Sequence, residues 1–224
     1  MTASILGRGV YDYSEAGRLI GVSGRRVAAW FRGRSSGRGP VLHGDYTDKL
    51  PNHRAISFLD LIEASVVSKL RVHGVSLIGI REAYSVLAKD HETNHPFSHK
   101  GLYTDGRRVF LRIADETGDE QLVDVLARQQ LFSRFILPYL QHIDYSDDTQ
   151  LAARWHIQKG VVIDPEYRFG KPIVESCTLP TSLLVAAYDA NGRDIDVVAD
   201  WYGATTKDVE MAVAFEKNLR QRAA

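Results

Sequence analysis

Apolar residues recur at helical spacing along the first part of the chain, between short turn signals. Two short helices are predicted within residues 13–31, where Ser14 and Ser23 can each accept a free backbone N–H of a first helical turn. Two longer helices follow, one over Phe58 to His73 with a cap at Ser57, and one after a cap at Ser76. This pattern predicts a mainly helical fold.

The first helix pair has the residue spacing of a helix-turn-helix. Gly17 is a small residue where the helices would touch, Gly21 lies in the turn, and Val27 and Trp30 would form the inner face of the second helix. A structural αα-hairpin has the same spacing.

Arg25 and Arg26 favour the DNA-binding interpretation. In a first helical turn they oppose the helix dipole, at a cost of roughly 0.3–1 kcal/mol each. When a phosphate docks at this helix end, the arginines contribute favourable free energy instead of a cost. We therefore predict that Ser23, Arg25 and Arg26 contact DNA, and the alternative is that both arginines are ordinary surface residues.

Residues 32–40 alternate arginine with glycine, serine and proline, which predicts a loop or hairpin tip. In such a loop the arginine cations lie beside glycines without side chains, so they can approach a phosphate or the DNA minor groove closely. Directly after a helix-turn-helix it is predicted to be a wing, with Arg32, Arg34 and Arg38 as further DNA-binding residues.

Two stretches near residue 100 have other interpretations. His91, His95 and His99 have a spacing that suits a metal only if they share a helix, and Pro96 would break that helix, so we predict a polar loop and no metal or cofactor. Residues 102–112 flank the turn signal Asp105-Gly106, which predicts a β-hairpin.

A polar break at residues 117–120 suggests a domain boundary, giving domains 1–112 and 113–224. The second begins with a helical linker, 128–143, whose apolar stripe runs from Leu131 to Ile143 and bends at Pro138. So broad a stripe must be buried, either inside the chain or against a second copy.

From Trp155 onward the pattern changes to short strands. These are predicted at 161–163 and 169–174, the second confined to a sheet edge by Pro172. A helix from Thr181 and a second pair with helix-turn-helix spacing, within 195–216, follow. Asp208 and Glu210 fall in the early turns of its last helix, where acids repel phosphate, so this pair is predicted to be structural or to bind protein.

Composition is that of an ordinary soluble globular chain of 224 residues, with 44% hydrophobic and 25% charged residues. No apolar run approaches the roughly 20 residues of a membrane span. The single cysteine suits a cytoplasmic location. Residues 1–112 hold 17 Lys+Arg and 10 Asp+Glu, leaving 11 and 18 for residues 113–224, so nucleic acid is expected on the basic half.

Residues 10–90 resemble the DNA-binding domain of MerR-type regulators. The resemblance rests on the first helix pair, the wing, and the segments Ile56–Ile62 and Leu70–Arg81 in that order. It implies a winged helix-turn-helix. The chain departs from the pattern in its longer wing and at Gly17, where alanine is commoner.

A second resemblance covers residues 155–219. Ile163-Asp164-Pro165, the segment Phe169–Val174 and the terminal helix pair are similar to the small helical domain of bacterial type II antitoxins, long catalogued as of unknown function. Some members carry a MerR-like domain in front, among them VapB-type antitoxins of mycobacteria, which the whole chain resembles. Glu175–Thr178 departs from the usual Gly-Thr-Arg.

These resemblances imply an antitoxin that binds operator DNA for autoregulation and silences a PIN-like ribonuclease toxin. Asp208, Glu210 and Glu216 are the predicted toxin contacts, and a homodimer is expected because one helix-turn-helix reads only a few base pairs. The alternative is a one-component regulator whose second domain senses a small molecule in a pocket near Trp155, Tyr188 or Trp201. No catalytic motif is found, and an enzyme is not expected.

Overall fold

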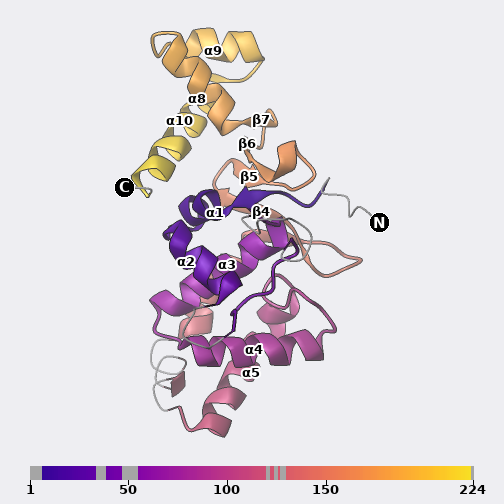
Figure 1. Cartoon of the computed structure of the whole chain (residues 1–224). Coiled ribbons are helices and arrows are strands. Elements are labelled where there is room, and N and C mark those ends of the chain that lie inside the picture. Colours follow the sequence, from indigo (N-terminus) through magenta and orange to yellow (C-terminus); the bar gives the residue numbers. More distant parts are fainter. Residues whose placement is uncertain are drawn as a thin grey trace. The chain divides into compact units, whose positions relative to one another are not determined.

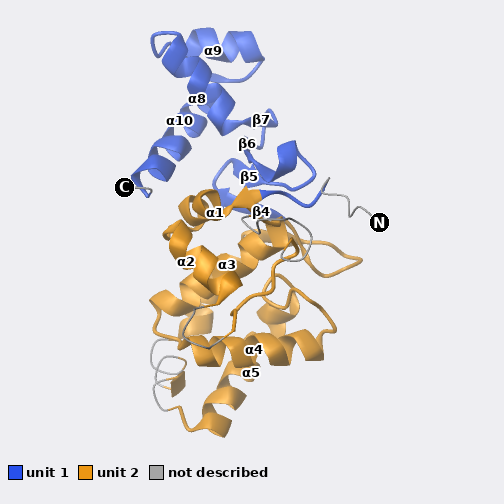
Figure 2. Cartoon of the chain, in the orientation of Figure 1, with its two compact units in different colours: residues 1–10, 154–224 blue, residues 11–153 orange. Residues whose placement is uncertain are grey.

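The computed structural model describes residues 7–33, 39–46, 55–119, 122–123, 126 and 130–222 (Figure 1). The chain forms two compact units (Figure 2). Unit 1 contains residues 1–10 and 154–224, and unit 2 contains residues 11–153. The units therefore divide the chain between residues 153 and 154, whereas residue 112, the boundary suggested by the sequence, lies inside helix α5 (Gly101–Thr117).

Unit 2 begins with strand β1 (Tyr11–Asp12) and the predicted helix pair, α1 (Tyr13–Ile20) and α2 (Gly24–Arg32). Asp12, and not Ser14, caps α1, since its side chain accepts from the N–H of Glu15 at 2.7 Å. Gly21 ends α1 with φ +77°, a conformation that glycine adopts without strain. β1 pairs antiparallel with β2 (Ala55–Ile56). The predicted wing falls largely on residues 34–38, which lie outside the described part of the chain.

Helix α3 (Phe58–Val72) is the central helix of unit 2. Its side chains are buried around most of its circumference, which is the burial expected of a helix packed on several sides. Ser57 caps it in a capping box with Asp60, as sequence reasoning predicts for the serine. Ser76 likewise caps α4 (Leu77–Asp90), whose inner face contains the buried Ile80, Tyr84 and Leu87.

The predicted hairpin at 102–112 is wrong, because these residues belong to α5. Its buried residues, Leu102, Gly106, Val109, Phe110 and Ile113, recur at helical spacing. A Cβ atom on Gly106 would lie 2.7 Å from Cε1 of Phe132. The glycine therefore allows close packing of a ring and does not form a turn.

The apolar stripe from Leu131 to Ile143 is buried within unit 2. It comprises the π-helical turn η1 (Phe132–Ile136), α7 (Leu137–Leu140) and the start of β3 (Ile143–Tyr145). Leu131, Ile136 and Leu140 are at most 1% exposed. Of the two sequence-based explanations, burial inside the chain is therefore the correct one.

The second sheet has the strand order β3-β4-β5-β6-β7. The division between the units falls within β4 (Ala152–Gln158), so unit 1 contains the rest of that strand together with β5 (Val161–Ile163), β6 (Pro172–Val174) and β7 (Leu179–Pro180). The short helix η2 (Arg168–Gly170) precedes β6. β6 lies between two strands, so the prediction that Pro172 marks a sheet edge is wrong. Pro172 begins β6, and β7 pairs only with the two residues after it, so the missing N–H interrupts no bond to β7.

Three helices complete unit 1: α8 (Thr181–Ala190), α9 (Ile195–Tyr202) and α10 (Thr206–Gln221). α9 and α10 are the predicted second helix pair, with a turn at Gly203, where φ is +62°. Their shared core is formed by Val174, Leu184, Val185, Val198, Ala199, Val209 and Ala212. The chain is thus mainly helical with small sheets, as predicted. Among the described residues no helix combines the length and the hydropathy that a membrane span requires.

Candidate nucleic-acid interface

The N-terminus of α2 lies at the protein surface, with its cap and its two arginines exposed. The Ser23 hydroxyl accepts from the N–H of Arg26 at 3.4 Å, the predicted cap. Arg25 and Arg26 are both exposed, and no acidic side chain lies in the first turn of α2. The structure therefore presents the three residues together at one helix end.

These residues line one side of a groove of about 840 Å³ in unit 2. Its walls also contain residues of α3, α4 and the segment after α2. The lining residues are Ser23, Arg25, Arg26, Ala29, Trp30, Val41, Ser68, Arg71, Val72, Leu77 and Arg81. Four arginines from three helices thus line the groove, and none of its lining residues is acidic.

Arg71 and Arg81 are fixed by backbone carbonyl groups. Arg71 Nη1 donates to the carbonyl of Val75 at 2.6 Å. Arg81 donates from Nη2 to Gly39 at 2.9 Å and from Nε to Pro40 at 3.3 Å. A guanidinium has five N–H donors, so each group retains donors for a ligand while the carbonyls hold its position.

Sequence reasoning does not select Arg71 and Arg81. Both belong to stretches whose pattern predicts helices of the core. Only the packing of α3 and α4 beside α2 brings them to the groove. A pattern along one helix therefore could not identify them.

Of the remaining predicted DNA-binding residues, Arg32 is described by the structure and does not line the groove. Arg32 is exposed at the end of α2, and its Cζ lies 5.3 Å from the centroid of the Tyr13 ring, a cation–π contact. Arg34 and Arg38 lie outside the described residues.

The predicted toxin contacts differ in exposure. Asp208 is only 4% exposed and is the acid of the capping box of α10, with the N–H of Thr205 donating to its Oδ2 at 2.9 Å. Glu216 is half-buried and accepts from the Thr181 hydroxyl at 2.5 Å. Glu210 is exposed. Of these three predicted contacts, Glu210 is therefore the one that is exposed and has no such structural role among the described residues of unit 1.

The charge asymmetry between the halves of the sequence does not coincide with the two units. Residues 11–153 contain 18 Lys+Arg and 18 Asp+Glu, and unit 1 contains 10 of each. Each unit therefore has no net charge. Positive charge is concentrated locally, at the groove, and net charge does not distinguish the two units.

Unit 1 exposes large aromatic side chains on α9. Trp201 is 65% exposed and Tyr202 is 36% exposed. Trp155 is buried, whereas Tyr188 lines an open groove with Asp189 and Arg193. These three aromatic side chains therefore do not line one common buried pocket. Their positions do not support the alternative in which the second domain senses a small molecule.

Of the three histidines with four-residue spacing, His91 and His99 lie together, and His95 lies apart from them. His91 ends α4, and its ring lies 4.8 Å from that of His99. His95 belongs to a different set of contacts, with carboxylates from α3 and the segment before it. The histidines therefore do not share a helix face, as the proline in their sequence indicates.

Comparison with known proteins places the chain close to an antitoxin. It is 28% identical over 222 residues to a protein of Mycobacterium tuberculosis (strain ATCC 25618 / H37Rv) named "Putative antitoxin VapB45". The match covers 91% of this chain and 92% of the relative. No protein-family model matches the chain.

The fold is also similar to a solved structure, the X-ray crystal structure of Rv2018 from Mycobacterium tuberculosis. The TM-score is 0.72 at 26% sequence identity, and the similarity covers 91% of this chain and 96% of that chain. The similarities in sequence and in structure thus extend over both units.

Proposed function

We propose that this chain is a VapB-type antitoxin of a type II toxin-antitoxin system, which binds the operator DNA of its own operon in the cytoplasm. The similarity in sequence to an antitoxin over nearly the whole chain supports the general role. The groove lined by four arginines is the observation that supports DNA binding.

In this proposal α1 to α4 form a MerR-like helix-turn-helix in which α2 is the recognition helix. The free N–H groups at the start of α2, Arg25 and Arg26 would contact phosphates or base edges, and Arg71 and Arg81 would hold the backbone on the other side of the groove. Arg32, Arg34 and Arg38 would act as wing residues and add sequence-independent affinity.

Measuring the affinity for the protein's own promoter at several salt concentrations tests DNA binding. We expect Arg25→Ala/Arg26→Ala to weaken binding by about 1–3 kcal/mol for each base edge that an arginine reads, and to reduce the salt slope by about 0.9 for each phosphate that an arginine neutralises. Arg107→Ala/Arg112→Ala is the matched control, because it removes two exposed arginines from α5 outside the groove. Equal affinity of the two double variants would contradict the proposal.

Unit 1 is the proposed toxin-binding unit, and the proposed toxin is a PIN-like ribonuclease. Exposed Trp and Tyr side chains are enriched among the residues that dominate protein interfaces, which makes Trp201 and Tyr202 suitable contacts. Glu210 adds an exposed carboxylate that a basic ribonuclease surface would attract. Asp208 is not included, because its carboxylate caps α10.

A further inference from the structure

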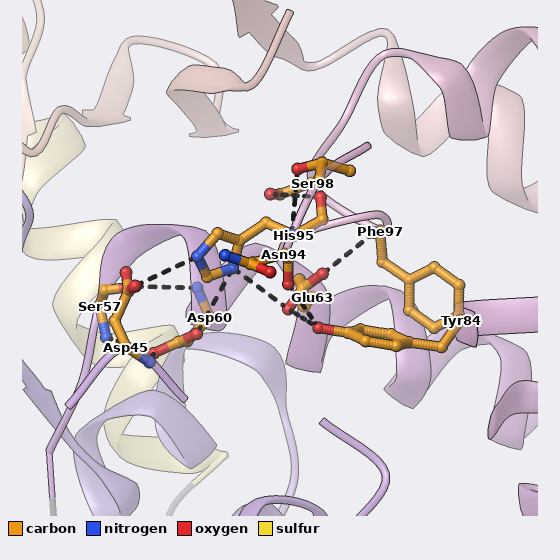
Figure 3. A network of polar contacts seen from close by, with 10 residues as sticks. Asp45, Ser57, Asp60, Glu63, Tyr84, Asn94, His95, Phe97 and Ser98 are labelled. Atoms are coloured by element: carbon orange, nitrogen blue, oxygen red, sulfur yellow. Dashed lines mark hydrogen bonds and ion pairs between the residues drawn. The ribbon is translucent and has the colours of Figure 1, made fainter. Parts of the chain in front are cut away.

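A buried histidine in unit 2 is surrounded by three carboxylates (Figure 3). His95 is 8% exposed, and Asp60 and Glu63 are fully buried on α3. Asp45 comes from the segment that follows α2. The proposed DNA-binding role uses none of these groups.

Part of each buried carboxylate has a structural role. Asp60 Oδ2 accepts from the N–H groups of Ser57 at 2.9 Å and Asp45 at 3.0 Å. Glu63 Oε1 accepts from the N–H of Phe97 at 3.0 Å. Asp60 Oδ1, in contrast, is buried and has no hydrogen-bond partner in the described part of the chain.

The imidazole of His95 lies between these oxygens. Its Nε2 lies 3.2 Å from Asp45 Oδ1. Its Nδ1 lies 3.7 Å from Asp60 Oδ1 and 3.5 Å from Glu63 Oε2, and it also has no hydrogen-bond partner among the described residues. When Nε2 carries the proton and donates it to Asp45, the Nδ1 lone pair faces the lone pairs of carboxylate oxygens. A positive charge at Nδ1, supplied by a second proton or by a cation, removes this repulsion.

The charges of the cluster lead to the same requirement. Three ionised carboxylates around one imidazole would leave at least two uncompensated negative charges in the interior even when His95 is protonated, which is costly unless they are neutralised. A divalent cation neutralises two of them.

The geometry allows a cation to reach the cluster and to be held there. Ligand atoms of Asp45, Asp60 and His95 all lie within 4.8 Å of one another. That span is near twice the bond length of roughly 2.0–2.2 Å from zinc to nitrogen or oxygen. A pocket of about 370 Å³, lined in part by Asp45, Tyr84 and His95, provides access. A buried site needs such an entry path.

We propose that His95, Asp60 and Asp45 bind a divalent transition-metal cation. His95 supplies a ring nitrogen, Asp60 supplies its unpartnered Oδ1, and Asp45 supplies a carboxylate oxygen, for which its hydrogen bond with Nε2 gives way. Glu63 contributes negative charge beside the site. Imidazole with carboxylates suits zinc or manganese better than magnesium, which prefers oxygen ligands. The cation joins the segment after α2, the start of α3 and the segment after α4.

Titration of the full-length protein with the metal alone tests the site. After treatment with a chelator and dialysis, we expect calorimetry with zinc chloride and with manganese chloride to show one cation per chain and a higher melting temperature. Binding should release a proton where His95 is protonated in the metal-free protein. Magnesium chloride should bind at least tenfold more weakly.

Two variants separate this site from the neighbouring histidine pair. We expect Asp60→Asn to lower the affinity at least tenfold, while His99→Gln, which changes the ring beside His91, leaves it unchanged. Unaltered binding in Asp60→Asn, or loss of binding in His99→Gln, would overturn the proposal.

A spectroscopic measurement on the wild-type protein covers the case in which Asp60→Asn does not fold. Histidine nitrogen shifts distinguish a metal-bound ring nitrogen from a doubly protonated ring. The expected result is a shift of a His95 ring nitrogen when zinc is added. A ring that keeps both protons in excess zinc would show that a proton supplies the positive charge, and the proposal would fail.

Discussion

Asp208 stabilises unit 1 through hydrogen bonds at the start of α10. Its Oδ2 accepts from the N–H of Thr205 at 2.9 Å, and the Thr205 hydroxyl accepts from the N–H of Asp208 at 3.2 Å. The hydroxyl of Ser176 also donates to its carboxylate. Because the side chain is 4% exposed, water cannot replace these contacts.

We expect Asp208→Ala to lower the free energy of unfolding by about 1–2 kcal/mol, since it removes the capping box of α10 and the hydrogen bonds that the carboxylate accepts from Thr205 and Ser176. Urea unfolding measures this change. Glu210→Ala is the matched control, because Glu210 lies in the same turn region but is exposed. An equally large decrease in Glu210→Ala would contradict the explanation.

The contribution of Asp208 should depend on pH. Burial acts to raise its pKa, but the hydrogen bonds from Ser176 and Thr205 outweigh burial and hold the pKa below the ordinary value of 3.8. A carboxyl whose pKa is lower in the folded state adds stability above its ordinary pKa and loses it as the pH falls through the folded value. The difference in stability between wild type and Asp208→Asn should therefore shrink in acid.

At the scale of elements, the α1–α2 turn depends on a glycine. A Cβ atom on Gly17 would lie 2.5 Å from the carbonyl oxygen of Val22 and 2.9 Å from the nitrogen of Gly24. Both neighbours are backbone atoms, so the turn itself would have to shift. The steric fit thus explains why this chain has glycine at position 17, where alanine is commoner in MerR-type helix pairs.

We expect Gly17→Ala to destabilise unit 2 by about 1–3 kcal/mol, because overpacking outweighs the gain of about 1 kcal/mol in helix propensity. Promoter affinity should fall as well, since the turn orients α2. Gly39→Ala is the control for stability, with no atom within 4 Å of the added Cβ. Thermal unfolding and promoter binding measure both effects, and a stabilised Gly17→Ala variant would show that the clash is relieved cheaply.

Local sequence signals predict those elements whose ends are set by neighbouring residues. Ser23, Ser57 and Ser76 each cap a helix as expected, since capping needs only the residues of one turn. The signal at Asp105-Gly106 fails because the ring of Phe132, distant in sequence, requires the glycine. Contacts between distant segments decide such positions.

The candidate groove is predictable only in part for the same reason. Ser23, Arg25 and Arg26 are close in sequence and can be recognised from their position in one helix. Arg71 and Arg81 join them through the packing of three helices. The cluster around His95 is missed by sequence reasoning because its members come from three separate segments.

At the scale of the whole molecule, the two proposed activities belong to different units and should be separable. We expect Trp201→Ala to reduce rescue of growth when the toxin is co-expressed, and to leave promoter affinity unchanged. A large exposed aromatic side chain can contribute about 2 kcal/mol or more to an interface, roughly a thirtyfold change in affinity. Tyr103→Ala, an exposed aromatic residue of unit 2, is the control. Full rescue by Trp201→Ala would place toxin binding elsewhere.

The full chain is expected to form a homodimer on DNA and in solution. One helix-turn-helix reads only a few base pairs, whereas two copies about one helical turn apart bind paired half-sites. The stripe from Leu131 to Ile143 is buried within the protomer, so it does not supply the contact. Light scattering at micromolar concentration should give twice the mass of 25.1 kDa, and a monomer would contradict this expectation.

The division of the chain also has a consequence for its synthesis. Unit 1 is discontinuous, since the N–H of Val10 donates to the carbonyl of Phe169 at 3.2 Å while residues 11–153 form the other unit. A ribosome that adds about 5–20 residues per second needs about 4–14 s for residues 154–224. During that interval the nascent chain already contains every residue of the arginine-lined groove. A chain released early would therefore carry the proposed operator-binding unit without the unit proposed to restrain the toxin.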